Sequence, residues 1–354
     1  MLVAACAVYA QIPNVSGRVT STDGSPVAGA VVSDGLNCTQ TDSDGRYTLT
    51  SDLENRHFIM LSVPAEYEIP ARHSLPIPFK RIPRYVETFT ADFVLEPRKE
   101  SSDHHTLIVQ GDPQIKDFFW DNSAEAYRDV VIPDIIKTRK SIATPCYGIE
   151  LGDVIYNELT VYPVYLHNTD RVNMVTFNVI GNHDHVQNAA TDREAVKKFE
   201  EYLGPTCYPV ELGELHFIFL DNIVMKNNTL DPNNVGAYSD GLSDEAYSWL
   251  CNDLKYVDKD RTVMLCAHSS MFRKPDSEPA DRDRHGPDYA SRLAQYRCVH
   301  SWAGHSHINF NYAYSAEEPA PKFPNVESHI LARSTGALWL NESMSSDGTP
   351  RGYM

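Results

Sequence analysis

The sequence predicts two domains of different class, a small all-β sandwich followed by a larger layered α/β domain. The chain has 354 residues, which exceeds the ~250–300 residues at which single cores usually stop growing. Short alternating strands separated by turn signals fill the chain up to about Leu95, without a helical period. After His105, short apolar runs alternate with segments of helical period, which is typical of layered α/β domains.

The first ten residues are small and apolar, and Val8-Tyr9-Ala10 before Gln11 fits a small-residue cleavage site. We therefore expect residues 1–10 to be the remnant of a signal peptide, although no basic residue precedes Leu2. Alternatively, Val3-Ala4-Ala5-Cys6 resembles a bacterial lipoprotein box, in which Cys6 is the lipid anchor. Both interpretations predict export to a periplasmic, extracellular or outer-surface location.

Residues 11–95 carry repeated turn signals, including Asp42-Ser43-Asp44-Gly45. The alternating Asp side chains could form a calcium loop, but the later acidic ligand of an EF-hand is missing and a hairpin turn explains them. The segments that begin at Val15, Pro26 and Thr41 resemble the carboxypeptidase-regulatory, transthyretin-like β-sandwich. Residues 96–105, rich in charge and serine, are the expected linker.

The second domain is expected over residues 106–335, with residues 336–354 as the start of a further, truncated β region. Its predicted strands are residues 107–110, 147–151, 175–180, 216–220, 262–266 and 299–302. Its predicted helices are residues 124–142, interrupted at Pro133, residues 191–203, and residues 246–254 after a Ser243 cap.

Polar side chains that can bind metals follow five of the predicted strands directly. The segments are Gly111-Asp112-Pro113-Gln114, Gly152-Asp153, Gly181-Asn182-His183-Asp184, Ala267-His268 and Gly304-His305-Ser306-His307. Since ligand sites of α/β sheets lie at the carboxyl ends of strands, these distant segments can converge on one crevice. Each segment alone is weak, because Gly-Asp usually marks a turn and a buried His is usually structural.

Together and in this order, the five segments resemble the signature of calcineurin-like metallophosphoesterases, between about Leu107 and His307. The resemblance implies a four-layer α/β/β/α sandwich that binds two metal ions, Mn, Zn or Fe. It implies that Asp153 bridges the ions. It further implies one ion bound by Asp112 and His307 and another bound by Asn182, His268 and His305.

The first motif departs from the commonest family pattern, because Gln114 stands where His is usual. Purple acid phosphatases, another branch, place a tyrosine three residues after the bridging Asp, and Tyr156 has that position here. We expect Gln114 to be the ligand and Tyr156 to be packing or substrate wall. A strong visible charge-transfer band of the iron-loaded protein would instead indicate a Tyr156 ligand.

By the same resemblance, a hydroxide between the two ions attacks phosphorus in line. His183 would protonate or stabilise the leaving oxygen, and Asp184 would orient its ring. Substrate contacts are expected from Asn182 and from a polar loop after His268 that carries Arg273 and His285.

The net charge of −17 disfavours binding to a nucleic-acid backbone, which needs clustered Lys and Arg. No apolar run approaches the ~20 residues that span a bilayer. The six cysteines after Cys6 lack metal spacing and are expected to be mostly buried thiols, with one or two disulfides as the alternative.

The expected activity is hydrolysis of small-molecule, lipid-linked or glycan-linked phosphomono- or phosphodiesters. A pyrophosphohydrolase acting on nucleotide-linked groups is one alternative. A non-catalytic surface-binding module with a degenerate metal site is the other.

Overall fold

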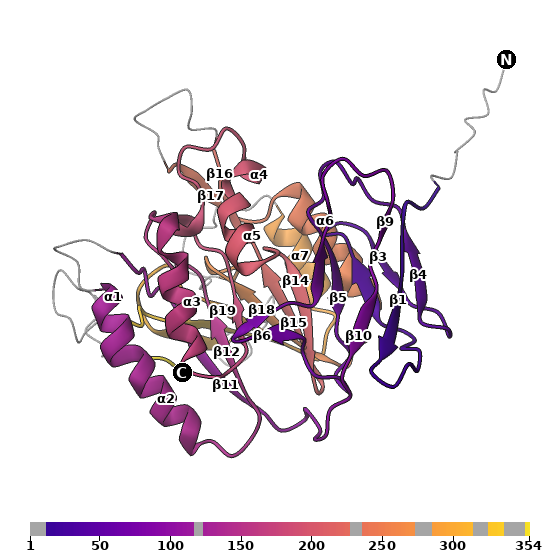
Figure 1. Ribbon diagram of the computed structural model, residues 1–354. Helices are drawn as coiled ribbons and strands as arrows, with labels where there is room; N and C mark the ends of the chain where they lie inside the picture. Colours follow the sequence, from indigo (N-terminus) through magenta and orange to yellow (C-terminus); the bar gives the residue numbers. More distant parts are fainter. Residues whose placement is uncertain (1–11, 117–122, 227–235, 273–284, 314–324, 336–350) are drawn as a thin grey trace.

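The computed structural model of the chain describes residues 12–116, 123–226, 236–272, 285–313, 325–335 and 351–354. It confirms the predicted fold class, because a β-rich N-terminal domain precedes a mixed α/β domain (Figure 1). The predicted signal segment and Cys6 lie outside the described residues, as do Arg273 and most of residues 336–354.

The N-terminal domain consists of two small sheets and a short hairpin. One sheet has the order β10-β1-β4, with β9 also pairing with β1, and the other has the order β3-β2-β5-β8. The strands are β1 Val15–Ser21, β2 Val31–Ser33, β3 Cys38–Gln40, β4 Arg46–Leu49, β5 Phe58–Ser62, β6 Ala71–Arg72, β7 Leu75–Pro76, β8 Phe79–Arg81, β9 Phe89–Thr90 and β10 Phe93–Leu95. Alternate residues of β4 are buried, as expected for a strand with one face toward a core.

The Asp42–Gly45 segment is a turn. The Asp42 carboxylate accepts hydrogen bonds from the backbone N–H groups of Asp44 (2.9 Å) and Arg46 (2.8 Å). One of its oxygens is therefore already used to hold the hairpin, as the turn interpretation expects.

The second domain contains two main sheets. A parallel sheet has the order β11-β12-β13, and a six-stranded sheet has the order β14-β15-β18-β19-β21-β20, parallel except at its two edge strands. The strands are β11 Thr106–Gln110, β12 Cys146–Glu150, β13 Thr176–Asn178, β14 Tyr208–Leu212, β15 Leu215–Leu220, β18 Thr262–Ala267, β19 Cys298–Ala303, β20 Phe310–Ala313 and β21 Val326–Ile330, and β16 Ile223–Met225 pairs with β17 Tyr238–Asp240. All the strands predicted for this domain are present.

The helices of the second domain lie outside the sheets. They are α1 Ser123–Ala126, α2 Ile132–Ser141, α3 Tyr162–Asp170, α4 Asp192–Ala195, α5 Lys197–Leu203, α6 Asp244–Asp253 and α7 Gly286–Leu293. The prediction of an interruption at Pro133 is wrong, because the chain stays helical there. A π-helix, Tyr127–Val131, precedes α2 and places Pro133 in the first turn of the new helix, where its missing N–H costs little.

Apolar packing supports the predicted α/β/β/α layering. One core contains Ile108 of β11 together with Ile132 and Tyr165 of α2 and α3. Another contains Leu265 of β18 together with residues of α6 and α7. Between the two sheets, side chains from both of them form a third core, which continues into the N-terminal sandwich. The sandwich is thus packed onto the second domain through buried apolar surface.

Polar contacts also join the two domains. Trp249 Nε1 of α6 donates to Ser33 Oγ (3.1 Å), and Asn252 Nδ2 donates to the Leu36 carbonyl (2.7 Å). In the connecting segment, Ser102 Oγ donates to the Ala65 carbonyl (3.0 Å) and accepts from the Gly213 N–H (2.9 Å). The connection between β10 and β11 is therefore fixed to both domains.

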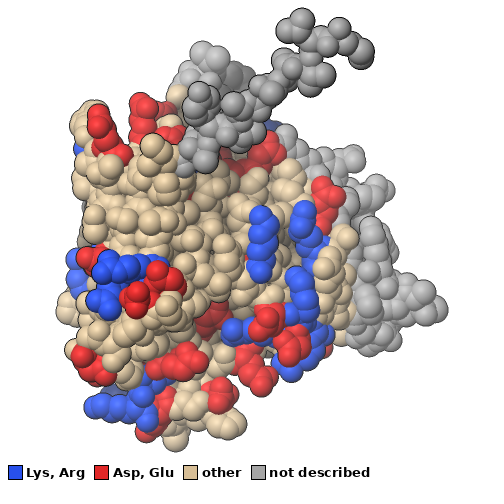
Figure 2. Space-filling view, turned by 90° about the vertical axis from the view of Figure 1, so that its right-hand side faces the viewer, with Lys and Arg blue, Asp and Glu red and all other residues tan. Residues whose placement is uncertain are grey.

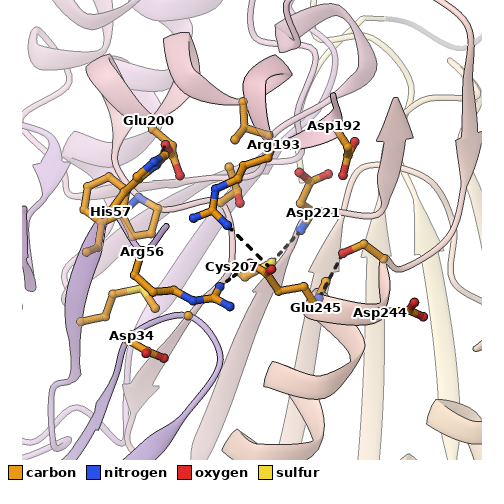
Figure 3. Close-up of a pocket in the computed structure, with 18 of the residues that line it drawn as sticks. Asp34, Arg56, His57, Asp192, Arg193, Glu200, Cys207, Asp221, Asp244 and Glu245 are labelled. Atoms are coloured by element: carbon orange, nitrogen blue, oxygen red, sulfur yellow. Dashed lines mark hydrogen bonds and ion pairs between the residues drawn. The ribbon is translucent and has the colours of Figure 1, made fainter. Parts of the chain in front are cut away.

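A cavity of about 450 Å³ lies between the domains, and charged side chains line it. Figure 3 shows Arg56 of the sandwich and Arg193 of α4 both directed toward Glu245 at the start of α6. The residues that line this cavity include none of the predicted metal ligands. The catalytic site predicted from the sequence is therefore elsewhere.

Acidic and basic side chains are intermingled on the face that carries the N-terminal domain (Figure 2). In the described part of the chain, none of the helices is long and apolar enough to cross a bilayer. The six cysteines found there are free thiols, so the disulfide alternative is not met in these residues. The expectation of mostly buried thiols is wrong as to burial, because only Cys266 is buried and the other five are half-buried.

Buried ionic contacts hold β14 and β15 of the six-stranded sheet to α6. His216 is 2% exposed, and its ring contacts Glu211 Oε1 (2.7 Å) and Asp253 Oδ2 (2.8 Å). Burial disfavours charge on His216, but the two carboxylates outweigh this effect and raise its pKa to about 10. Because the folded-state pKa is the higher one, this stabilisation is complete below the ordinary His pKa of about 6.5 and is lost as the pH rises through about 10.

We expect His216→Gln to lower the melting temperature by several degrees near neutral pH, since the buried Asp253 carboxylate loses its His216 cation and Glu211 keeps only Arg261 (2.8 Å). Thermal unfolding of both proteins between about pH 6 and pH 10 should show the difference narrowing as the pH rises. His104→Gln, at an exposed position, is the matched control. A difference that stays constant across this range would contradict a charged His216.

Candidate metal centre

The five motif segments converge at the carboxyl ends of strands from both main sheets. Asp112 follows β11, Asp153 follows β12 and Asn182 follows β13 in the first sheet, while His268 follows β18 and His305 follows β19 in the second. The backbone N–H of His305 donates to Asp112 Oδ1 (3.1 Å), so segments 193 residues apart in sequence meet there. The predicted crevice is thus formed jointly by the two sheets.

Asp153 lies at the centre of this group. Its Oδ1 is 3.3 Å from His268 Nε2, and its Oδ2 accepts a hydrogen bond from Gln114 Nε2 (2.9 Å). The two oxygens of one carboxylate therefore face two different groups of ligand atoms. This is the arrangement needed for a carboxylate shared by two cations.

The first group of ligand atoms lies on the Oδ1 side of Asp153. His268 Nε2 is 3.1 Å from Asn182 Oδ1 and 3.2 Å from His305 Nδ1. Ligands bonded to a cation at ~2.0–2.1 Å in a tetrahedral arrangement are separated by about 3.3–3.4 Å. The nitrogen and oxygen atoms on this side thus have the spacing and the chemistry of a ligand set for a transition metal.

The second group lies on the Oδ2 side. His307 Nε2 is 3.3 Å from Asp112 Oδ1 and 3.1 Å from Gln114 Nε2, and ligand atoms of Asp112, Asp153 and His307 all lie within 4.8 Å of one another. Gln114 presents its amide nitrogen, which cannot bind a cation. Binding of a cation through Oε1 requires a half-turn of the Gln114 amide. Asp112, Asp153 and His307 already present ligand atoms to the same point.

The backbone of these loops is strained at several of the predicted ligands. Nine described non-glycine residues have positive φ, and five of them are predicted ligands: Asp112 (52°), Gln114 (44°), Asp153 (51°), His305 (66°) and His307 (58°). Such conformations cost of order 1–3 kcal/mol each and cluster at functional sites. Their concentration here favours a functional role over ordinary turns.

Two glycines allow the loops to approach each other. A Cβ at Gly181 would lie 2.2 Å from the Asp153 backbone nitrogen, and a Cβ at Gly304 would lie 2.2 Å from Asp112 Oδ2. Only glycine permits this proximity between neighbouring ligand loops.

The centre contains several buried acidic groups, and added positive charge would stabilise their ionised forms. Burial opposes charge on both Asp153 and His268, but their close contact outweighs it, lowering the pKa of Asp153 and raising that of His268 to about 10. Glu150, at the end of β12, is fully buried, and burial together with Asp112 and Asp184 raises its pKa well above the usual value. Several acidic groups are therefore concentrated in one dry site, which suits the binding of divalent cations.

The predicted pairing of His183 with Asp184 is wrong in its geometry. The Asp184 carboxylate is fully buried and accepts hydrogen bonds from the backbone N–H groups of Gly181, Val154 and Ile155 (2.8–3.2 Å). His183 Nδ1 instead contacts Asn157 Oδ1 (2.8 Å). Adjacent residues on this tight turn point in different directions, so Asp184 holds the loop while Asn157 orients the ring.

His183 Nε2 faces the metal centre, 3.9 Å from Asp153 Oδ2. Tyr156 stacks on the His183 ring, with 4.0 Å between ring centroids, and Lys116 Nζ lies 3.4 Å from the centroid of the Tyr156 ring. The position of Tyr156 suits a side wall of the site next to His183.

His285 contacts Asp244 Oδ1 (2.8 Å) and stacks on Tyr247. Its expected contact with substrate stays a prediction.

Three residues near the centre were not among the predicted site residues. Asn157 contacts and orients the His183 ring. Asp240 Oδ1 lies 3.8 Å from His305 Nε2. Glu150 adds a buried carboxyl group. Asn157 and Glu150 lie within four residues of Asp153, but nothing in their types or spacing distinguishes them from ordinary loop and strand residues. Asp240 comes from the β16–β17 hairpin, whose position only the tertiary structure gives.

Comparisons with known proteins agree with the motif resemblance. A family model described as the N terminal of calcineurin-like phosphoesterase matches residues 13–98. The β-rich N-terminal domain is therefore similar to the N-terminal domain that this model describes. The match confirms the resemblance to calcineurin-like phosphoesterases, and the predicted hydrolase class is supported at the level of this family. No curated protein matches the chain.

Several solved structures are similar at low sequence identity. A dimetal phosphatase from Danio rerio has 15% identity and a TM-score of 0.46, covering 68% of this chain and 90% of its own. A purple acid phosphatase from yellow lupin has 12% identity and a TM-score of 0.46, covering 90% and 61%. A 5'-nucleotidase from Candida albicans has 13% identity and a TM-score of 0.37, covering 64% and 45%.

We expect Gly304→Ala to reduce bound metal by about one ion per chain, because the new Cβ would displace the Asp112 carboxylate. Metal analysis of protein dialysed against Mn²⁺ or Zn²⁺ measures this loss. Gly352→Ala is the control, since a Cβ there meets nothing within 4 Å. Unchanged metal content in a folded Gly304→Ala protein would contradict Asp112 as a ligand.

Proposed function

We propose that the chain is a metal-dependent phosphoesterase that hydrolyses phosphomono- or phosphodiesters at a dinuclear centre. The observation that carries this proposal is the position of Asp153, whose two carboxylate oxygens face two separate ligand groups. Asp153 would be shared by both ions. Asn182, His268 and His305 would complete one site, and Asp112, His307 and the turned amide of Gln114 the other.

The mixed nitrogen and oxygen ligands suit Mn, Zn or Fe. Bound at this centre, two such cations would neutralise phosphate charge and lower the pKa of a coordinated water, so that no protein nucleophile is needed. The residues of the chain fix the two ligand groups on a rigid double sheet. This rigidity would hold a phosphate group in a defined orientation for in-line attack.

His183 is the proposed proton donor to the leaving oxygen. Asn157 Oδ1 can only accept a hydrogen bond, so Nδ1 of His183 carries a proton and Nε2 is the atom that exchanges one. Burial lowers the pKa of His183 more than Asp153 raises it. A bound phosphate dianion would favour the protonated ring again, so the acid form would be reached in the substrate complex.

The substrate class proposed is a small-molecule, lipid-linked or glycan-linked phosphoester, with Asn182 also contacting the phosphate. A nucleic-acid backbone is disfavoured by the net charge of −17. Export is proposed from the apolar N-terminal segment, which makes an envelope or extracellular ester the more suitable substrate.

We expect Asp153→Asn to lose nearly all hydrolysis of nitrophenyl phosphate mono- and diesters, because one amide oxygen cannot serve two cations. Wild-type protein, Asp153→Asn and the exposed control Asp260→Asn should be assayed with Mn, Zn, Fe or Ni, with and without chelator. Wild-type activity abolished by chelation supports the enzyme, and a pyrophosphate substrate in the same panel tests the pyrophosphohydrolase alternative. A metal-loaded wild-type protein inactive on every ester would favour the binding module.

His183→Ala should lower kcat by about 10²–10⁴-fold while metal content stays at the wild-type value, since the imidazole supplies a proton and not a ligand. The loss should be larger for a poor leaving group than for nitrophenolate. Asn157→Ala should produce a smaller loss and a shifted pH profile, because the ring remains but is less well oriented. Wild-type turnover of a poor leaving group by His183→Ala would eliminate the acid role.

A further inference from the structure

A second group of metal-binding side chains lies on the six-stranded sheet, on strands β19 and β21. His300 of β19 is the register partner of Glu327 on β21, and His329 comes two residues after Glu327 on the same face. These are not ligands of the centre described above. They are 27%, 43% and 16% exposed at their side chains, for His300, Glu327 and His329, so an ion from solvent can reach them.

The ligand atoms of this group converge on one point. His300 Nδ1 is 3.1 Å from His329 Nε2 and 3.5 Å from Glu327 Oε2, and His329 Nε2 is 3.9 Å from the same carboxylate oxygen. These separations bracket the ~3.3–3.4 Å expected between ligands of a tetrahedral zinc ion. Chemically, two imidazoles and one carboxylate form a common set of zinc ligands.

The remaining ring nitrogens are held by further contacts. His329 Nδ1 contacts Asn311 Oδ1 (2.8 Å) on β20, and the indole of Trp302 stacks on the His329 ring at 4.3 Å. His300 Nε2 lies 3.6 Å from Cys298 Sγ. Metal-binding histidines usually have their second nitrogen fixed in this way. The Asn311 contact places a proton on Nδ1 of His329 and leaves its Nε2 lone pair directed at the convergence point.

The composition of the group also fits a divalent cation. The two imidazole nitrogens that face each other, His300 Nδ1 and His329 Nε2, lie only 3.1 Å apart, and the Glu327 carboxylate is the third ligand-bearing group around the same point. A divalent cation at that point would contact all three groups and balance the carboxylate charge.

We propose that His300, Glu327 and His329 bind a divalent transition-metal ion, with Zn²⁺ as the best match to the ligands and water as its fourth ligand. The ion would join β19 to β21 across their shared register. It would also stabilise the strand whose carboxyl end carries His305 and His307. The proposed ion does not depend on the proposed phosphoesterase activity.

Zinc stoichiometry tests this proposal. Equilibrium dialysis followed by elemental analysis should show one Zn²⁺ fewer per chain in His300→Gln/His329→Gln than in the wild-type protein. The same difference of one should appear in the Asp153→Asn background, where binding at the other centre is impaired. His167→Gln, which removes an exposed helix histidine, is the matched control. Equal zinc content with and without the double substitution, in either background, would overturn the proposal.

Glu327→Gln keeps the test decisive if the double variant fails to fold. Glu327 is the most exposed of the three ligands, so the fold should survive, as circular dichroism would verify. Zinc affinity at this site, measured by competition with a chromophoric chelator in the Asp153→Asn background, should fall by at least ~10-fold. Zinc should also raise the melting temperature of the Asp153→Asn protein more than that of Asp153→Asn/Glu327→Gln. Equal affinity in a folded Glu327→Gln protein would exclude Glu327 as a ligand and overturn the site.

Discussion

The structure depends on one electrostatic constraint, the concentration of buried carboxylates around Asp153. Asp112, Asp153, Glu150 and Asp184 are each at most 1% exposed, all near the ends of strands of the first sheet. Like charges at such short range cannot all be ionised in a dry site unless positive charge is present. Part of that charge comes from His268 on the second sheet, whose contact with Asp153 joins the two sheets. Two bound cations would supply the rest, so the predicted ligand set and the stability of the sheet pair have the same physical cause.

The packing around the ligand loops stabilises their strained backbone. Five of the proposed ligands lie on left-handed backbone, and Gly181 and Gly304 bring the loops closer than a Cβ would permit. Such strain persists only where the structure around it is rigid. The two sheets share one apolar core that continues into the N-terminal sandwich, and the connection between the domains is fixed at Ser102. The sandwich is thus part of the framework on which the ligand loops rest.

Strand β19 connects the two proposed metal sites. Its carboxyl end leads into His305 and His307, and its first half carries His300. An ion held by His300, Glu327 and His329 would fix β19 against β21, and the His305 loop would then start from a firmly held strand. The two sites share no ligand and differ in character. One joins two sheets with several buried acids, and the other joins two strands of one sheet at a partly exposed surface.

The sequence by itself determined the two-domain class, the strands of the second domain and the segments that meet at the centre. These follow from apolar periodicity and from polar residues placed directly after strands, which are local features. The tertiary structure alone decided that Asn157 rather than Asp184 contacts His183 and that helix continues through Pro133. It also brought together His300 and His329, which are 29 residues apart. Side-chain direction on a tight turn and register between strands depend on long-range packing, and residue type and spacing do not encode them.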